Sequence, residues 1–515
     1  MAILLYLFIV SIFAIISLKD NDGKLIYALD DAYIHMAIAK NMALNQTWGF
    51  SDGNFASASS SPLWTALISL LFAIFGIKEI IPFILNIIFG ILAIISLYNC
   101  AKIEHFRDKD IWYMLFLSVI IIPLPVITML GMEHNLHIML SIIFIHRASL
   151  MLLDLHKSEN GDVWPFIIAP LLVGARYEGL FMVMAVFLVL IYMKRFGRAF
   201  LLLLLGFIPI IVMGIIAKSN GWHFLPTSLV IKGNTGNFDS FKNIAKLFVN
   251  FLYQPFKFPY VLPIIGWNIA VFIFLIKNKK KLFALGTILT GLFILTFFAH
   301  SHVSRFGWLY RYEAYLYAIG IFVFFNSYRQ AFGFIKGSIT RKIVIIVAFV
   351  LTIGLIGFRT IDSYRIVSRA PHTIYRQQYQ IGKFIERFYE GETIVVNDIG
   401  APSFLAEFQL IDPYGLGTKE LAIPVAERQD RHMDTIRCFI ENEKPQIAII
   451  YEFFHVDSSW IKCGSWVSPQ NEICADDSIL VFAIDSSKAE RLIRNFMEFR
   501  RNMPAGVETR VPVRH

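Results

Sequence analysis

The sequence is poor in charged residues and in cysteine. Only 17% of its 515 residues are charged, while 56% are hydrophobic, and the mean hydropathy is +0.60. A soluble globular chain carries about 25% charged residues, so this composition excludes a water-soluble fold. The formal net charge of +9 does not indicate a nucleic-acid partner, because the basic residues lie in short clusters between apolar runs, where they orient membrane helices.

Cysteine is scarce, and the chain shows neither an internal repeat nor a low-complexity linker. The four cysteines, Cys100, Cys438, Cys463 and Cys474, have no metal-ligand spacing with histidines. If the C-terminal part lies outside the cytoplasm, two interpretations stay open, a disulfide between Cys463 and Cys474 or free thiols. No cofactor is predicted, and a divalent cation is compatible with the residues but not indicated by their spacing.

Long apolar runs dominate the first 360 residues. A helix that crosses a bilayer needs roughly 20 apolar residues, and runs of about this length, or somewhat shorter, cover 3–18, 80–99, 112–130, 163–175, 179–193, 199–217, 258–276, 282–299, 312–326 and 342–358. With a further crossing at 132–153, the sequence predicts about eleven spans. The first run lacks a basic n-region and a cleavage site, so we expect it to stay as a span.

Basic clusters between the runs predict the orientation. They contain Lys102, Arg107, Lys109, Lys194, Arg195, Arg198, Lys277, Lys279, Lys280, Lys281, Arg329, Lys336, Arg341 and Lys342. Such clusters stay in the cytoplasm. With a cytoplasmic N-terminus, all of them lie inside only if the apolar stretch 62–77 is a juxtamembrane or re-entrant helix. The sequence thus predicts a multi-pass protein of the inner or plasma membrane whose C-terminal part is extracytoplasmic.

From about residue 373 onward the chain becomes more polar. Residues 374–389 and 487–503 have helical patterns, and 393–396 and 446–451 are typical of short buried strands. These elements predict a small α/β domain. The expected division is a transmembrane domain at 1–360, an extracytoplasmic α/β domain at 361–503 and a flexible tail at 504–515.

The predicted orientation collects the unusual polar segments on the extracytoplasmic side. Charges at a membrane boundary cost free energy unless they are paired or hydrated, so their convergence from separate helices predicts a site. Asp30 and Asp31 follow the first span. Adjacent residues at a helix start point in different directions, so that one carboxylate can face a pocket as a general base while the other caps the helix. Two capping or solvated acids are the alternative.

Cations from four later segments complement the two acids. A phosphate group requires such a set, whose members are Arg176, Lys232, Arg305 and Arg311; each alone would more often anchor a lipid headgroup. Further polar and aromatic residues are expected to touch a sugar or an acceptor, or to orient the residues that do. They are Tyr33, His35, Trp64, Glu133, His134, Tyr177, Glu178, Trp308, Tyr312 and Glu313.

Several of these segments together resemble a known family. The stretch from Asp30-Asp31-Ala-Tyr-Ile-His to Ser61-Pro62-Leu-Trp64, with Gly131-Met-Glu-His, Arg176-Tyr-Glu-Gly, Leu225-Pro-Thr-Ser and Arg311-Tyr-Glu-Ala-Tyr-Leu, resembles the GT-C membrane glycosyltransferases. Among them it is most similar to the mycobacterial terminal arabinofuranosyltransferases. The resemblance continues through Gln377-Gln-Tyr-Gln, Asn397-Asp-Ile-Gly and Gly415-Leu-Gly.

The resemblance implies a fold and a reaction. The expected fold is an α-helical polytopic GT-C domain. The expected reaction moves a monosaccharide from a polyprenyl phosphate to a glycan or glycolipid acceptor outside the cytoplasm, with an acidic residue of the first extracytoplasmic loop as its centre. Asp30 and Asp31 match the family's paired acids, and Asp30 is preferred as the base.

Two other functions, a transporter and a scaffold, are the alternatives to the enzyme. A transporter or flippase of lipid-linked sugars would also be polytopic and basic where phosphate binds, but transporters place charges near the bilayer midplane and have repeated halves. Neither feature is evident in this sequence. A membrane scaffold would give no reason for acids, arginines and aromatic residues to converge on one face. The sequence favours a glycosyltransferase.

Overall fold

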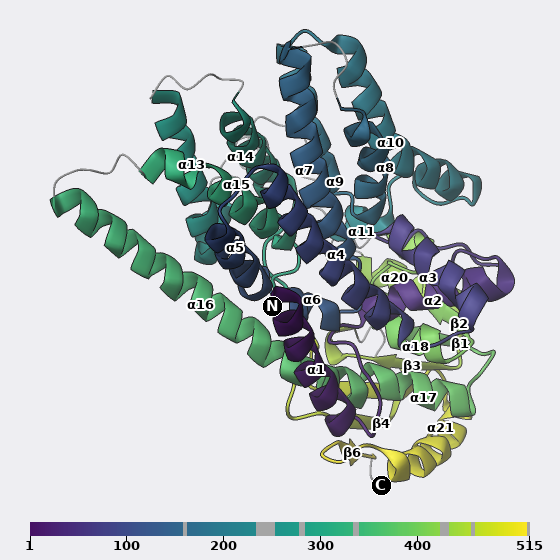
Figure 1. Ribbon diagram of the computed structural model, residues 1–515. Coiled ribbons are helices and arrows are strands. Elements are labelled where there is room, and N and C mark those ends of the chain that lie inside the picture. The colour runs from purple at the N-terminus through teal and green to yellow at the C-terminus, as the bar shows by residue number, and fades with distance from the viewer. Residues whose placement is uncertain are drawn as a thin grey trace.

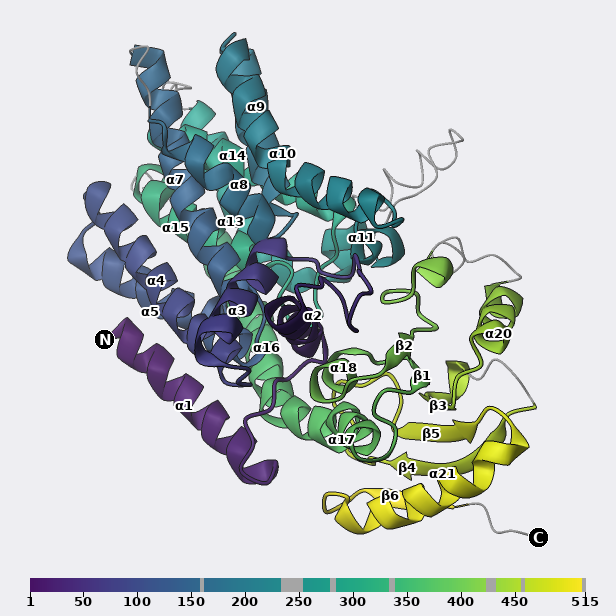
Figure 2. The same ribbon diagram turned by 90° about the vertical axis from the view of Figure 1, so that its right-hand side faces the viewer.

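The chain forms a long helical bundle with a mixed sheet at one end (Figures 1 and 2). The computed structural model describes residues 1–157, 162–232, 253–277, 284–332, 339–422, 432–454 and 459–511. The helices of the bundle are α1 (Ala2–Asp20), α2 (Asp31–Asn45), α3 (Pro62–Phe75), α4 (Ile81–Ile103), α5 (Asp108–Ile121), α6 (Leu124–Met129), α7 (His134–Lys157), α8 (Trp164–Ala175), α9 (Gly179–Tyr192), α10 (Phe196–Ser219), α11 (Thr227–Lys232), η1 (Pro259–Val261), α13 (Leu262–Lys277), α14 (Leu285–Val303), α15 (Ala314–Phe332) and α16 (Ile339–Arg376).

The bundle is built to lie in a membrane. In the described residues, seven helices are long and apolar enough to cross one, and four shorter apolar helices accompany them. Large apolar side chains stay exposed on the outer surfaces of these helices, such as Phe8 on α1, Ile215 on α10 and Phe358 on α16. Helices satisfy their own backbone hydrogen bonds, so they are suited to a solvent of lipid chains. The chain is an α-helical multi-span membrane protein.

Each predicted span corresponds to helical structure. The run at 112–130 is divided between α5 and α6, and α7 occupies the predicted crossing at 132–153. Helix α7 lies at the centre of the bundle, where it packs against α4, α8, α9, α14 and α15. Nothing in the structure fixes which side of the membrane each helix end faces, so the predicted orientation stays a prediction.

Helix α3 covers most of the apolar stretch 62–77, which the sequence predicts not to cross the membrane completely. Pro62 occupies its first turn, and the Ser61 side chain accepts a hydrogen bond from the Trp64 backbone N–H. Its 14 residues rise about 21 Å, whereas the hydrocarbon layer is about 30 Å thick. Helices α8 and α9, two of the predicted spans, are as short, at 12 and 14 residues, so the partial crossing of α3 stays a prediction.

The C-terminal unit contains the mixed sheet. Its elements are α17 (Gln378–Phe388), β1 (Thr393–Val396), α18 (Gly400–Leu405), β2 (Gln409–Ile411), α20 (His432–Glu443), β3 (Ile447–Ile450), η2 (Glu452–Phe454), β4 (Ile461–Val467), β5 (Ser478–Ala483), α21 (Ser486–Phe499), η3 (Arg500–Asn502) and β6 (Glu508–Arg510). The strand order is β2-β1-β3-β5-β4-β6. Strands β2, β1 and β3 are parallel to one another, and the remaining pairs are antiparallel.

Both faces of this sheet are covered. Because successive strand residues point to opposite faces, Ile394 and Val396 pack with α17 and α21, while Val395 packs with Ile436 and Ile440 of α20. The predicted strands at 393–396 and 446–451 are confirmed as β1 and β3.

Two boundaries differ from those expected. The predicted division at residue 360 lies inside α16, which continues without a break from Ile339 to Arg376 and leads from the bundle into the C-terminal unit. The tail predicted from residue 504 is also shorter than expected, because 508–510 form β6, which pairs antiparallel with β4. Polar edge strands such as β6, Glu-Thr-Arg, carry no apolar alternation that would reveal them in the sequence.

Candidate active site

Asp30 joins the first loop of the bundle to the C-terminal unit. Its Oδ2 accepts the backbone N–H of Gly400 at 2.8 Å, and its Oδ1 accepts that of Ala401 at 2.8 Å. Asp30 precedes α2, but its carboxylate therefore caps a different helix, α18. Gly400 permits this close approach, since a Cβ there would lie 2.2 Å from the Asp30 carbonyl oxygen. Burial, and then the neighbouring Asp398, raise the pKa of Asp30 to about 8.

Asp31, the next residue, contacts Arg311 and not α18. Its Oδ2 accepts a hydrogen bond from Arg311 Nη2 at 2.8 Å, and its side chain remains 22% exposed. An ion pair with a guanidinium favours the ionised form of a carboxylate, which is the form that a general base requires.

Two cavities meet at Asp31. The interdomain cavity, of about 390 Å³, lies between the bundle and the C-terminal unit, and its lining includes Asp30, Asp31, Trp308, Gln378, Asp398, Asp412, Tyr414 and Tyr451. The helix-side cavity, of about 280 Å³, lies within the bundle, and its lining includes Asp31, His35, Arg176, Tyr177, Glu178, Phe181, Ile210 and Ser228. The wall that both cavities share contains Asp31, Ile34, Arg305, Arg311, Tyr312 and Leu416.

The arginines of the two cavities have different partners. Arg176 forms ion pairs with Glu133 and, at 2.7 Å, with Glu178. Arg311 pairs with Asp31, and its buried Nε has no hydrogen-bond partner in the part of the chain that the structure describes. Arg305 is exposed and pairs with none of the described acids. Arg305 therefore has donor capacity for an anion at the shared wall, while both terminal nitrogens of Arg311 already have partners.

Supporting residues surround Arg176. The His35 Nδ1 lies 2.8 Å from Thr65 Oγ1, and its Nε2 lies 3.6 Å from Glu133 Oε2. His134 Nε2 lies 3.4 Å from Arg176 Nη1. Two arginine side chains lie over one aromatic ring, with the Arg176 and Arg311 Cζ atoms 5.7 Å and 5.0 Å from the centroid of Tyr312.

Tyr33, Trp64 and Glu313 are absent from both linings, as are Glu133 and His134, which contact Arg176. Tyr33 packs edge-on against Tyr27, and Trp64 is buried beside Phe89. Glu313 accepts the Gly307 backbone N–H at 2.9 Å and lies 3.7 Å from Arg359. Lys232 ends α11, and its side chain lies outside what the structure describes. The first three residues shape the surroundings of the site instead of contacting its cavities.

The loop before α15 has an uncommon conformation. Gly307, Trp308, Leu309 and Tyr310 have φ values of 90°, 49°, 59° and 58°. Non-glycine residues in this left-handed region cost about 1–3 kcal/mol each and persist only where the surroundings hold them. Here Glu313 holds the Gly307 N–H, and Arg359 Nη2 donates to the Tyr310 carbonyl at 3.3 Å. The turn presents Trp308, 52% exposed, at the interdomain cavity.

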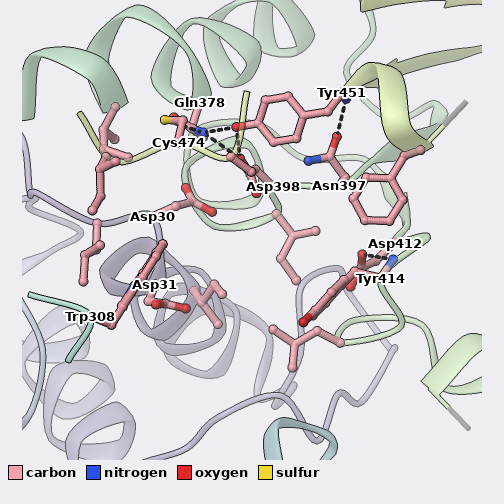
Figure 3. Close-up of a pocket in the computed structure, with 18 of the residues that line it drawn as sticks. Asp30, Asp31, Trp308, Gln378, Asn397, Asp398, Asp412, Tyr414, Tyr451 and Cys474 are labelled. Atoms are coloured by element: carbon pink, nitrogen blue, oxygen red, sulfur yellow. Dashed lines mark hydrogen bonds between the residues drawn. The ribbon is translucent and has the colours of Figure 1, made fainter. Parts of the chain in front are cut away.

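The C-terminal unit supplies half of the interdomain cavity, which the sequence analysis did not assign. The carboxyl ends of parallel strands form a common edge where ligands bind in α/β sheets. Asp398 follows β1, Asp412 follows β2, and Tyr451 follows β3. Asp398 Oδ2 accepts the Tyr451 hydroxyl and Gln378 Nε2, both at 2.6 Å (Figure 3). The family resemblance includes the motifs that contain Gln378 and Asp398. These motifs are the feature of the sequence that could have revealed this half of the cavity.

The cysteines are thiols. Cys474 Sγ donates to Gln378 Oε1 at 3.3 Å, while Cys463 lies in β4 with no disulfide. Of the two interpretations left open, the structure has the free thiols. Within the described ranges no group of three or more His, Cys, Asp and Glu side chains is arranged to hold a metal ion.

Comparison with solved structures identifies the type of fold. The chain is similar to the crystal structures of ArnT from Cupriavidus metallidurans, in the apo state with a TM-score of 0.53 and bound to undecaprenyl phosphate with a TM-score of 0.50. In both comparisons the identity is 12%, and the match covers 94% of this chain and 98% of ArnT. The fold is GT-C-like.

Sequence comparisons add little to this. Residues 371–482 match a family described as "Domain of unknown function (DUF8728)". None of the curated proteins matches the chain. The similarity to GT-C membrane glycosyltransferases is thus one of structure, it extends over most of the chain, and nothing in it is specific to arabinofuranosyltransferases.

Proposed function

We propose that the protein is a membrane glycosyltransferase that moves a monosaccharide from a polyprenyl phosphate to a glycan or glycolipid. The observation that carries the proposal is the shared wall, where Asp31 and two arginines stand between two cavities. A transferase needs two substrates to meet at one catalytic group, and this arrangement provides it.

The helix-side cavity is the proposed donor site. Apolar residues such as Phe181 and Ile210 line it together with Arg305 and Arg311, which suits a ligand with a lipid chain and a phosphate. The hydroxyls of Tyr177 and Ser228 are buried in its lining, without a hydrogen-bond partner among the described residues, and are available to sugar oxygens. The similarity to ArnT, which was crystallised with undecaprenyl phosphate, supports a polyprenyl-phosphate donor.

Asp31 is the proposed base. An acceptor hydroxyl attacks C1 of the donor sugar, its proton passes to Asp31, and the bond between C1 and the phosphate oxygen breaks. The phosphate leaves with the electron pair, and the charge on it is balanced by Arg305 and Arg311. Asp30 was preferred for this role from the sequence. The contacts of its two oxygens with Gly400 and Ala401 instead suit a positioning residue that fixes Asp31.

The test uses the purified protein in lipid nanodiscs with a panel of polyprenyl-phosphate monosaccharides. Polyprenyl-phosphate arabinofuranose is the first donor of the panel, because of the family resemblance. We expect one donor to stabilise the protein thermally and to be hydrolysed slowly. Asp31→Asn should lower turnover by about 10²- to 10⁴-fold and keep the donor-dependent stabilisation, while Asp52→Asn, at an exposed position, should behave as wild type.

Two results would contradict the proposal. Full turnover in Asp31→Asn would exclude this residue as the base. Stabilisation by no donor in the panel would favour a transporter or flippase of lipid-linked sugars, the alternative from the sequence. The predicted location, a cell membrane with the C-terminal unit outside the cytoplasm, is tested separately by labelling single cysteines introduced at exposed loop positions in intact cells.

A further inference from the structure

The charges of the interdomain cavity differ from those of the donor site. Its lining contains the four acids Asp30, Asp31, Asp398 and Asp412, and its two arginines both belong to the shared wall. Beyond that wall, its charged side chains in the described part of the chain are acids only. An anionic ligand placed there would gain no balancing cation beyond the shared wall.

Four backbone donors beside this cavity are also occupied. N–H groups at turns and helix starts commonly bind phosphate, but here the protein's own carboxylates take them. Asp30 holds the N–H groups of Gly400 and Ala401. Asp412 accepts those of Tyr414 and Gly417, each at 2.8 Å. Beyond the shared wall a phosphate would therefore meet no cation in the described lining, and these four backbone donors are not free to bind it.

Aromatic side chains line the same cavity and remain exposed. Trp308 is 52% exposed, Tyr414 36% and Phe453 57%. Figure 3 shows Trp308 on the same side as Asp31 and Tyr414 on the other side, with Asp412. Phe453 is stacked on Tyr451, with ring centroids 5.5 Å apart. Exposed apolar rings grouped at one cavity mark a binding site, and flat rings pack against the apolar faces of sugars.

We propose that the interdomain cavity binds the acceptor as an uncharged glycan, whose sugar residues there carry no phosphate. This inference rests on the proposed function. Rings of Trp308, Tyr414 and Phe453 stack on the sugars, while the carboxylate of Asp398, at the carboxyl end of β1, accepts hydrogen bonds from their hydroxyls. The terminal hydroxyl then lies beside Asp31, across the shared wall from the donor.

The experiment compares acceptors with the same donor. Wild-type protein in nanodiscs receives the radiolabelled donor found above and one of two sets of acceptors. The first set contains neutral tetrasaccharides of glucose, mannose, galactose and arabinose, and the second the same compounds phosphorylated on the non-reducing sugar. We expect transfer to at least one neutral compound, and at least tenfold lower kcat/KM for its phosphorylated counterpart. Equal use of both would overturn the proposal.

Variants locate the acceptor. Trp308→Ala and Phe453→Ala should each raise the acceptor KM by about tenfold and change the acceptor KM more than the donor KM. Met497→Ala removes another exposed apolar side chain of the C-terminal unit, outside the lining of the cavity, and should change neither. An unchanged acceptor KM in both aromatic variants would overturn the proposal.

The two proposals fail in different ways. If donor hydrolysis by water persists but no acceptor result follows the expected pattern, this inference fails and the glycosyltransferase stands. If no donor is bound or hydrolysed, the proposed function itself fails.

Discussion

Gly400→Ala tests whether Asp30 holds the C-terminal unit against the bundle. A Cβ at this position would lie 2.2 Å from the Asp30 carbonyl oxygen and 2.7 Å from its Oδ2, so α18 must move away. At least one of the two hydrogen bonds to the carboxylate is then lost. At neutral pH, below its pKa of about 8, Asp30 is mostly protonated, and a hydrogen bond between neutral groups contributes about 0.5–1.5 kcal/mol. This corresponds to a roughly 2- to 13-fold change in a local opening equilibrium.

Hydrogen exchange measures this opening directly. We expect the amides of 400–405 to exchange roughly 2- to 13-fold faster in Gly400→Ala, together with a loss of transfer. Gly357→Ala is the matched control, since a Cβ there meets nothing within 4 Å and alanine is the better helix former. If exchange at 400–405 were the same in Gly400→Ala as in wild type, Asp30 would not be the docking group, and its role as a positioning residue would be refuted.

Three further changes have defined outcomes. Arg305→Ala should raise the donor KM by roughly 10- to 150-fold without altering thermal stability, whereas Arg501→Ala, at an exposed position of the C-terminal unit, should leave the donor KM unchanged. The raised pKa of Asp30, about 8 against about 3.9 in the unfolded chain, means that its contribution to stability is complete below pH ~4 and lost as the pH rises through 8; the fall in thermal stability over this range should be shallower in Asp30→Asn, and an equal slope would contradict the assignment. Arg359→Met should lower the free energy of unfolding by about 3–5 kcal/mol, because it leaves Glu313 buried without its cation, and adding Glu313→Gln should restore part of that loss in denaturant titrations.

The helical part of the fold was predictable because a bilayer imposes a strong local rule. Each crossing helix must be apolar over most of its length, and every predicted run became helical structure. The strands β1 and β3 could also be predicted, since they are short buried runs. Strand β4 contains Lys462, Gly464 and Ser465 and was missed, because its apolar pattern is interrupted where it packs against β5 with a bulge.

The site was only half predictable, for a different reason. Asp31, Arg176, Arg305 and Arg311 come from separate helix ends that a common membrane side brings together. The acids that follow β1 and β2 reach the same cavity only because the strand order β2-β1-β3 aligns their carboxyl ends, and strand order depends on pairing between distant segments. No local pattern around Asp398 or Asp412 contains that information.

The different roles of Asp30 and Asp31 depend on such a distant contact. The sequence does not distinguish these two adjacent acids. They differ because Asp30 accepts a hydrogen bond from Gly400, which lies 370 residues further along the chain. Because consecutive Cα atoms are about 3.8 Å apart, a carboxylate fixed on the C-terminal unit restricts where the next one can lie. The contact of Asp30 with α18 thus restricts the position of Asp31 against Arg311, and it couples docking of the C-terminal unit to the Asp31–Arg311 ion pair.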